Sequence, residues 1–257
     1  MSPVHPKKSL GQHFLKDENI ARKIVGSLKC EGITQVVEVG PGTGILTKYL
    51  FESKRFNTTI VEIDNESYAH LITLYPEKIN NIRCQDILTF DFKYFGNKTI
   101  AVIGNFPYHI SSPLFFKILH DKDIVAEVVC MIQKEVADRI IAPPGSKTYG
   151  ILSVLLQAYY NIENLFTVSP HVFIPPPKVK SSVIRLTRNN ISKLDCSEDL
   201  FFKVVKTCFN QRRKMIRNSV RNLIPGDIPE HELFHNRPEQ LSVDRFVELT
   251  CMIEDII

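Results

Sequence analysis

The four residues Asn105-Phe106-Pro107-Tyr108 have the types and spacing to do specific chemistry, because they combine polar acceptors with an aromatic ring. They follow the apolar run Ala101–Ile103, so the four residues stand at the end of a predicted strand. We expect the side-chain carbonyl of Asn105 and the backbone carbonyl of Phe106 to accept hydrogen bonds from the two N–H bonds of one amino group. Pro107 fixes the turn, and Tyr108 supplies a ring on which a planar base can stack. Taken alone, the same residues also suit an ordinary β-turn followed by a core tyrosine.

A glycine-rich turn lies upstream, at the end of another predicted strand. The run Val36–Val39 passes into Gly40-Pro41-Gly42-Thr43-Gly44, and glycines in such a turn let the backbone pass close to a ligand. The spacing Gly-x-Gly-x-Gly differs from the dinucleotide fingerprint, whose third glycine comes one residue later. Glu38, directly before the turn, favours a cationic ligand over a polyphosphate. A lone glycine turn is just as often a simple strand-to-helix connection.

Two further acidic residues end the next two predicted strands. Glu62 comes about twenty residues after the glycine turn, where a carboxylate can bridge both hydroxyls of a ribose. Asp86 ends the following strand, where it can bind the amino group of an adenine. Each carboxylate taken singly suits a solvated cap. Their order at successive strand ends favours S-adenosylmethionine as the cofactor over NAD, although NAD also has a ribose that Glu62 would accept.

The elements that must position these residues alternate between short β-branched runs and helical stretches. The predicted strands are Gln35–Val39, Thr58–Ile63, Ile82–Cys84, Thr99–Ile103, Val125–Ile132 and Lys180–Thr187. Predicted helices include Asp17–Leu28 and Tyr149–Tyr159. This alternation predicts an α/β, Rossmann-like fold with a mostly parallel sheet that helices cover on both faces.

The C-terminal part differs in composition from the strand-rich part. The polar segment 188–193 lacks periodicity and is interpreted as a linker, and Ser197 and Ser242 suit the N-caps of two later helices. We therefore expect a catalytic domain with an N-terminal arm at residues 1–188 and a small all-helical domain at residues 189–257.

The formal net charge of +4 is too small to indicate a nucleic-acid partner, but its distribution is informative. Residues 201–223 contain no Asp or Glu, and we call this stretch the basic segment. Its cations are Lys203, Lys206, Arg212, Arg213, Lys214, Arg217 and Arg221. Such a run predicts contacts to nucleic-acid phosphates, although charge alone equally suits a solvated helix face.

Composition narrows the class of protein further. Hydrophobic residues make up 44% and charged residues 23% of the chain, and no apolar run is long enough to cross a bilayer. The basic N-terminus has no following apolar region, so we expect a cytoplasmic protein without a membrane partner. The six cysteines form no Cys-x-x-Cys pair, which favours reduced thiols and predicts no metal site.

Five stretches spread over nearly the whole chain match motifs of one known family. They are Ser9–Leu15, Glu38–Gly44, Asn105–Tyr108, Val172–Val179 and Phe209–Lys214. These stretches resemble the ribosomal RNA small-subunit adenine N6-dimethyltransferases, class I S-adenosylmethionine-dependent enzymes also known for kasugamycin sensitivity. The resemblance implies methyl transfer to two adjacent adenosines near the 3′ end of 16S rRNA, in the small ribosomal subunit or its precursor, by a monomeric enzyme that contributes to subunit maturation.

The resemblance also implies roles for individual residues. The residues that would bind S-adenosylmethionine are Gln12, His13, Leu15, Gly40, Gly42, Glu62, Asp86 and Asn105. The catalytic pocket would combine Asn105, Phe106, Pro107 and Tyr108 with Phe173, which would face Tyr108 across the target base. RNA phosphates would contact Arg212, Arg213, Lys214, Arg217 and Arg221.

Two positions depart from the usual pattern of the family. Phe106 stands where Leu is commoner, but the role expected there belongs to a backbone carbonyl. His13 replaces a frequent Asn, and both side chains can form a hydrogen bond to the donor.

Three alternatives remain open at this point. A large-subunit RNA adenine methyltransferase of the macrolide-resistance type has similar catalytic motifs, although the C-terminal sequence Gln211-Arg212-Arg213-Lys214 favours the small-subunit enzyme. A non-catalytic ribosome-assembly or transcription factor would use the same fold only to bind nucleic acid. An NAD-dependent dehydrogenase is the most distant alternative.

Overall fold

The computed structural model describes residues 4–7, 10–96 and 98–257, and its contacts divide the chain into two compact units. Unit 1 is formed by Met1–Ala137 and Asn161–Arg188, and unit 2 by Asp138–Tyr160 and Asn189–Ile257. Lys8 of the predicted N-terminal arm and Ser9 of the first motif lie outside the described residues. Residues 138–160 were expected in the catalytic domain, whereas in the structure they group with the C-terminal residues.

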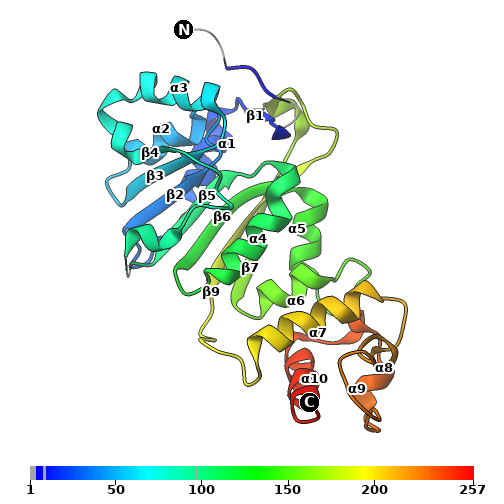
Figure 1. Cartoon of the computed structure of the whole chain (residues 1–257). Helices are drawn as coiled ribbons and strands as arrows, with labels where there is room; N and C mark the ends of the chain where they lie inside the picture. Colours follow the sequence, from blue (N-terminus) through cyan, green and yellow to red (C-terminus); the bar gives the residue numbers. More distant parts are fainter. Residues whose placement is uncertain (1–3, 8–9, 97) are drawn as a thin grey trace. The chain divides into compact units, whose positions relative to one another are not determined.

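Unit 1 is built on a seven-stranded sheet (Figure 1) with the strand order β4-β3-β2-β5-β6-β9-β7. Its strands are β2 (Gln35–Val39), β3 (Asn57–Glu62), β4 (Ile82–Cys84), β5 (Ile100–Asn105), β6 (Val125–Gln133), β7 (Tyr160–Val168) and β9 (Ser181–Arg188). β2 pairs in parallel with β3 and β5, β3 with β4, and β5 with β6, while β9 runs antiparallel to β6. The prediction of a mostly parallel sheet is therefore confirmed.

The predicted strands are present with small shifts at their ends, because β-branched runs buried on both faces form the centre of the sheet. β7 was not predicted. Its residues alternate poorly between buried and exposed positions, and Asn161, Glu163 and Asn164 interrupt its apolar character. It lies at the edge of the sheet, where burial constrains the sequence less.

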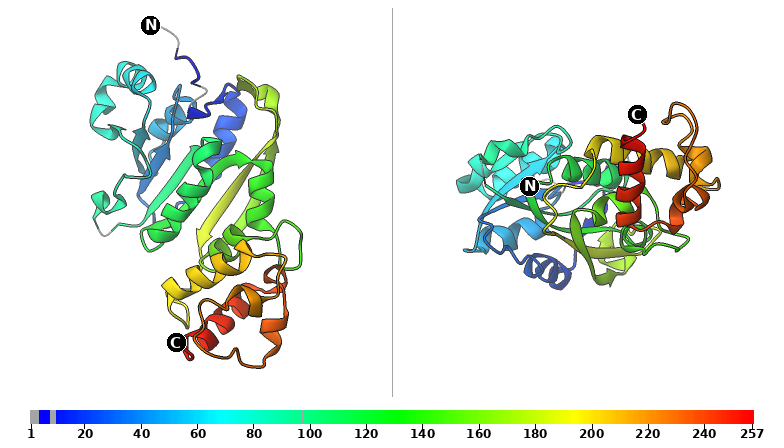
Figure 2. Two further views of the ribbon diagram at one scale, coloured as in Figure 1. Left: turned by 45° about the vertical axis from the view of Figure 1, so that its right-hand side comes forward. Right: turned by 90° about the horizontal axis from the view of Figure 1, so that it is seen from below.

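The helices of this part of the chain lie on both faces of the sheet. They are α1 (Glu18–Gly26), α2 (Ile45–Glu52), α3 (Asn65–Leu74) and α4 (Ser111–His120), while α5 (Lys134–Ile141) begins in unit 1 and ends in unit 2. Figure 2 shows α1 and α2 on one face and α4 on the other. This placement of the helices follows from right-handed crossovers, because the step from β2 to β3 and the step from β5 to β6 run in opposite directions across the sheet. Asp17 caps α1 by accepting from the backbone N–H groups of Asn19 and Ile20.

A second, two-stranded sheet ties the N-terminal segment to the proline-rich turn. β1 (Phe14–Leu15) pairs antiparallel with β8 (Phe173–Ile174), which the sequence did not predict. Its residues Leu15 and Phe173 are opposite each other and belong to the hydrophobic core of the unit.

Unit 2 is a small helical bundle with its own apolar contacts. Its elements include α6 (Ile151–Gln157), α7 (Glu198–Asn210), α8 (Ile216–Ser219), α9 (Glu232–His235) and α10 (Val243–Glu254). α7 contacts both α6 and α10, and the rings of Phe209 and Phe246 stack with their centroids 5.8 Å apart. Ser197 and Ser242 accept from backbone N–H groups at the starts of α7 and α10, so both predicted N-caps are confirmed. Residues 138–160 belong here because α6 packs its apolar face on α7.

Candidate active site

β2 and β5 are neighbours at the point of the sheet where the chain changes the direction in which it adds strands. β2 continues to β3 on one side, and β5 lies on the other side of β2. In open α/β sheets, ligands bind beyond the carboxyl ends of the strands at such a switch point. The glycine turn follows β2 and the Asn105 tetrad ends β5, so both predicted motifs meet at this edge of the sheet.

An open cavity of about 880 Å³, which includes the space at its mouth, lies at this edge. Most of the predicted site residues line it, namely Gln12, His13, Gly40, Gly42, Glu62, Asp86, Asn105, Phe106, Pro107 and Tyr108. They come from the N-terminal segment and from the ends of β2, β3, β4 and β5. The structure therefore brings together residues that are far apart in the sequence.

Asn105 has one end of its amide fixed by a neighbouring backbone. Its Nδ2 donates to the carbonyl oxygen of His13 at 2.9 Å. Because the amide nitrogen is committed to that bond, Oδ1 is the atom of the amide that remains to accept from a ligand. The backbone of the tetrad is anchored as well, since the N–H of Phe106 donates to the carbonyl of Met131 in β6 at 3.0 Å. Asn105 therefore presents an oriented acceptor at the cavity.

The two aromatic residues of the tetrad have different positions. The Phe106 side chain is buried and packs edge-on against Phe115 of α4, with ring centroids 6.2 Å apart. Tyr108 is partly buried, its hydroxyl lies 2.8 Å from the hydroxyl of Ser181, and its ring packs on His13. Burial raises the pKa of Tyr108, while the hydrogen bond to Ser181 opposes this rise. Phe106 anchors the turn, and the Tyr108 ring is held beside the cavity.

Two close approaches explain the glycines just before the Asn105 tetrad and in the glycine turn. A Cβ on Gly104 would lie 2.5 Å from the carbonyl oxygen of Val39, so only glycine lets β5 approach β2 this closely. Gly42 has a φ of +56°, and a Cβ there would lie 2.8 Å from the ring of Phe14. The Phe14 ring therefore packs directly against the glycine turn.

Glu62 is buried and its two carboxylate oxygens are both used by backbone groups. Oε2 accepts from the N–H of Gly42 at 3.1 Å, and Oε1 accepts from the N–H of Asp64 at 2.8 Å. Burial raises the pKa of Glu62, although these backbone hydrogen bonds lower it in part. The carboxylate therefore braces the glycine turn and also faces the cavity, where its remaining lone pairs can accept from a ligand.

Glu38 is the most deeply buried carboxyl group of the site. Its Oε2 accepts from the hydroxyl of Thr47 at 2.7 Å, and Oε1 has no hydrogen-bond partner within the described part of the chain. Burial raises the pKa of Glu38 to about 8; the Thr47 hydroxyl opposes this rise and the nearby charge of Glu62 adds to it. Glu38 also lines a smaller hollow beside the glycine turn, together with Gly40 and Asn105. A buried carboxyl with an unused oxygen suits a positively charged group nearby.

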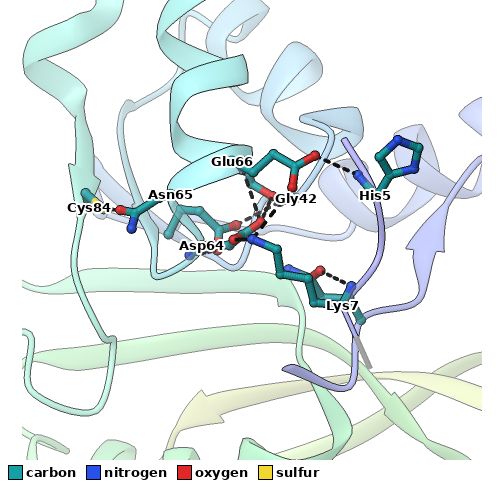
Figure 3. Close-up of polar contacts among 10 residues, drawn as sticks. His5, Lys7, Gly42, Asp64, Asn65, Glu66 and Cys84 are labelled. Atoms are coloured by element: carbon teal, nitrogen blue, oxygen red, sulfur yellow. Dashed lines mark hydrogen bonds and ion pairs between the residues drawn. The ribbon is translucent and has the colours of Figure 1, made fainter. Parts of the chain in front are cut away.

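The N-terminal segment is fastened beside the cavity by charged residues (Figure 3). The side chain of Lys7 forms an ion pair with Asp64, and the N–H of His5 donates to Glu66 at 3.1 Å. The N–H of Lys7 also donates to Oε1 of Gln12 at 2.8 Å. Burial alone would raise the pKa of Asp64, but the hydrogen bonds from Lys7 and Ser67 lower it below its ordinary value. These contacts join the segment to the start of α3.

Two predicted site residues do not line this cavity. Leu15 and Phe173 are 3% and 2% exposed and pack in the hydrophobic core next to each other. Successive side chains of a strand point to opposite faces, so in β1 Phe14 faces the cavity and Leu15 faces the core. The expected role of Phe173 opposite Tyr108 across the target base stays a prediction.

The cavity also contains residues that the sequence analysis did not assign to it. They are Leu10, Gly11, Phe14, Val39, Val61, Ile63, Gln85, Ile87, His109 and Ile110. Most are direct neighbours of predicted residues, so the signal that would have found them is adjacency at the same strand ends. Gly11 has a φ of +56°, and a Cβ there would lie 2.9 Å from Nδ1 of His109.

The basic segment lies in unit 2 and its cations differ in their surroundings. Arg212 donates to the carbonyl of Ser146 at 3.3 Å and lies 3.7 Å from Glu239, so it holds parts of its own unit together. Arg221 donates to the carbonyl of Gly226. Arg217 is half-buried, whereas Arg213 and Lys214 are exposed. Of the five cations expected to contact RNA, Arg213 and Lys214 are therefore the ones best able to reach an external phosphate.

Among the described residues, no helix is long and apolar enough to cross a membrane. Within the same residues, no group of three or more His, Cys, Asp or Glu side chains is arranged to hold a metal ion.

The chain is similar to known proteins over nearly its whole length. The family model described as ribosomal RNA adenine dimethylase matches residues 4–256. The chain is 52% identical over 260 residues to the Ribosomal RNA small subunit methyltransferase A of Bacteroides thetaiotaomicron, covering 100% of this chain and 97% of the relative.

Two solved structures have the same fold. A dimethyladenosine transferase from Plasmodium falciparum superposes with a TM-score of 0.79 at 25% identity, over 95% of this chain and 98% of the other. The 23S rRNA methyltransferase ErmE superposes with a TM-score of 0.66 at 25% identity, over 91% of this chain and 98% of the other.

Proposed function

Because the chain belongs to the ribosomal RNA adenine dimethylase family, we propose that it dimethylates N6 of two adjacent adenosines near the 3′ end of 16S rRNA. The methyl donor is S-adenosylmethionine, and the RNA is presented in the small ribosomal subunit or its precursor. The enzyme acts as a monomer in the cytoplasm and contributes to subunit maturation.

The observation that carries this proposal is the orientation of the Asn105 amide. Its Nδ2 is committed to the carbonyl of His13, which leaves Oδ1 as an acceptor beside the cavity. An adenine amino group is a poor nucleophile, because its lone pair is delocalised into the ring. Oδ1 of Asn105 and the backbone carbonyl of Phe106 accept from its two N–H bonds and favour a pyramidal nitrogen. Tyr108 supplies the ring on which the base stacks.

The residues of the cavity fit the proposed donor. Bound S-adenosylmethionine supplies a methyl group on a positively charged sulfur. Glu38, with its unused buried oxygen next to the glycine turn, suits this positive charge. Gly40 and Gly42 would let the backbone pass close to the donor, Glu62 would bind the ribose hydroxyls, and Asp86 would bind the adenine amino group. Catalysis then depends mainly on holding the amine in line with the methyl group, without a strong general base.

The RNA would be held in part by the basic segment. Arg213 and Lys214 are exposed and suit phosphates, whereas Arg212 already has partners within unit 2. We assign the phosphate contacts to residues 189–257 and the chemistry to residues of unit 1.

Mass mapping of modified nucleosides tests the proposal. Small subunits from cells that lack this protein are incubated with S-adenosylmethionine, with and without the purified chain. We expect dimethyladenosine at two adjacent positions near the 3′ end of 16S rRNA only when the chain is present. Unmodified adenines in both samples would refute the proposal.

A second candidate function, methylation of large-subunit RNA, is favoured by the structural similarity to ErmE. The same assay with naked and partly assembled large-subunit RNA separates the two. Dimethyladenosine in the large-subunit RNA alone would replace the small-subunit assignment.

A further inference from the structure

Glu38 is a buried carboxyl group for which the described part of the chain provides no positive charge. Its side chain is 1% exposed, and within the described residues it forms no ion pair and leaves Oε1 without a hydrogen-bond partner. The hydroxyl and the backbone N–H of Thr47 donate to it. Burying an ionised carboxyl without a cation is costly, so such a group takes up a proton instead. Burial accordingly raises the pKa of Glu38 to about 8, and the group is mostly neutral in the donor-free protein at pH 7.

The titratable groups that face Glu38 do not supply a cation either. On the neighbouring strand β3, the charge of Glu62 raises the pKa of Glu38 further. Burial raises the pKa of Tyr75, which follows α3, and the charge of Glu38 raises it further. From α2 the contact is Thr47, which does not titrate. The smaller hollow beside Glu38 is otherwise lined by residues without titratable side chains, namely Phe14, Leu15, Gly40, Pro41, Thr43, Ile45, Leu46 and Asn105.

This hollow adjoins the cavity proposed to hold the methyl donor. Phe14, Gly40 and Asn105 line both of them. S-adenosylmethionine carries a sulfonium, an ammonium and one carboxylate, and the ammonium begins to lose its proton only near a pH of about 7.7. A donor in the cavity therefore brings net positive charge next to the wall that contains Glu38. A positive charge within about 4–6 Å favours the ionised form of a carboxyl group.

We propose that binding of the methyl donor is coupled to the release of one proton, and that Glu38 is the group that loses it. The inference rests on the proposed function, because that function supplies the positively charged donor. On binding, the neutral carboxyl of Glu38 becomes a carboxylate and its proton passes to solvent. The donor then gains a buried counter-charge. A neutral nucleoside gains none, so Glu38 helps to discriminate the charged donor from uncharged adenosine derivatives.

The coupling gives the donor affinity a pH dependence of definite sign. Below a pH of about 8, the free protein holds a proton that the complex has lost, so a lower pH favours the free protein. The Kd for S-adenosylmethionine should therefore fall about tenfold from pH 6 to pH 7, as the release of one proton requires. In this range the ammonium of the donor stays charged.

Calorimetry of the full-length chain at pH 7 counts the released protons, because the observed heat differs between phosphate and Tris, two buffers with different heats of ionisation. The ligands are S-adenosylmethionine and 5′-methylthioadenosine, an adenosine derivative without a positive group. Glu38→Gln keeps the shape of the side chain and removes the titratable group. The matched control is Glu52→Gln, which removes an exposed carboxyl at the end of α2. Protons exchanged by the cavity imidazoles of His13 and His109 would persist in both variants.

We expect wild type and Glu52→Gln to release close to one proton with S-adenosylmethionine and none with 5′-methylthioadenosine. Glu38→Gln should release none, and its donor Kd should not change between pH 6 and pH 7. Donor binding by wild type without proton release, equal release with the uncharged ligand, or wild-type release in Glu38→Gln would overturn the inference. The contrast between the two ligands needs only the wild-type chain, so the test holds even if Glu38→Gln does not fold. A wild-type chain that releases the proton but methylates no RNA would instead refute the proposed function and leave the coupling in place.

Discussion

The cavity of unit 1 and the basic segment of unit 2 hold their polar side chains in different ways. In the cavity, Glu62 and Asn105 are fixed by hydrogen bonds to backbone groups, and Glu38 is buried next to them. In the basic segment, Arg213 and Lys214 are exposed to solvent. The cavity therefore depends on atomic positions and on burial. The basic segment depends on charge, which acts over longer distances and is screened by salt.

The largest expected effect concerns the buried carboxyl group of Glu38. Its pKa is raised from an ordinary value of 4.5 to about 8, mainly by burial, so the folded protein keeps a proton that the unfolded chain loses. Stability therefore falls as the pH rises from about 5 to 8, by up to about 1.4 kcal/mol for each pH unit. Glu38→Gln should remove most of this dependence. Urea denaturation of the donor-free protein at pH 5.5 and pH 8 measures it. An unchanged pH dependence in Glu38→Gln would show that Glu38 is not the group responsible.

The close approach of β5 to β2 should give the next largest effect. Gly104→Ala places a Cβ against the carbonyl of Val39, and overpacking of this kind costs about 1–3 kcal/mol of unfolding free energy. Gly26→Ala is the matched control, because a Cβ there meets nothing within 4 Å and Gly26 ends α1. Urea denaturation should show a loss for Gly104→Ala and no loss for Gly26→Ala. Equal stability of the two variants would argue against a tightly packed site.

Charge reversal in the basic segment should give a smaller, salt-dependent effect. Arg213→Glu with Lys214→Glu should weaken RNA binding about tenfold at low salt and make the slope of log Kd against log salt shallower. The control reverses two exposed lysines of unit 1, Lys54 and Lys98. Filter binding over a range of salt concentrations measures both. If the two double variants lose affinity equally, the effect belongs to net charge and not to the basic segment.

Much of the fold was predictable because local patterns and global burial agree. β2 at the centre of the sheet is rich in β-branched residues and flanked by turn residues, and it was predicted with the bounds that it has in the structure. The short edge strand β4 was also predicted with its bounds. β7 was missed because its edge position leaves polar residues in the strand. Residues 138–160 were assigned to the wrong neighbours, since an apolar helix does not reveal in sequence which surface it covers.

The site was predictable where a residue type fixes its role, and less so where a side-chain direction decides. Gly40, Gly42, Glu62, Asp86 and the Asn105 tetrad line the cavity as expected. Leu15 and Phe173 do not, because in two-residue strands a shift of one position moves a side chain from the cavity to the core. The hydrogen bonds of His13 with Asn105 and with Pro175 span 92 and 162 residues, which no local pattern contains.

The central claim is that Asn105 presents an oriented acceptor to the target amine, and methylation by Asn105→Ala tests it most directly. Transfer of labelled methyl groups from S-adenosylmethionine to small subunits is measured for wild type and variant, together with RNA affinity. We expect kcat to fall by a factor of about 10²–10³, as for the loss of one oriented polar group in an active site, with RNA affinity unchanged. Methylation at the wild-type rate, or an equal loss of RNA binding and methylation, would contradict the claim.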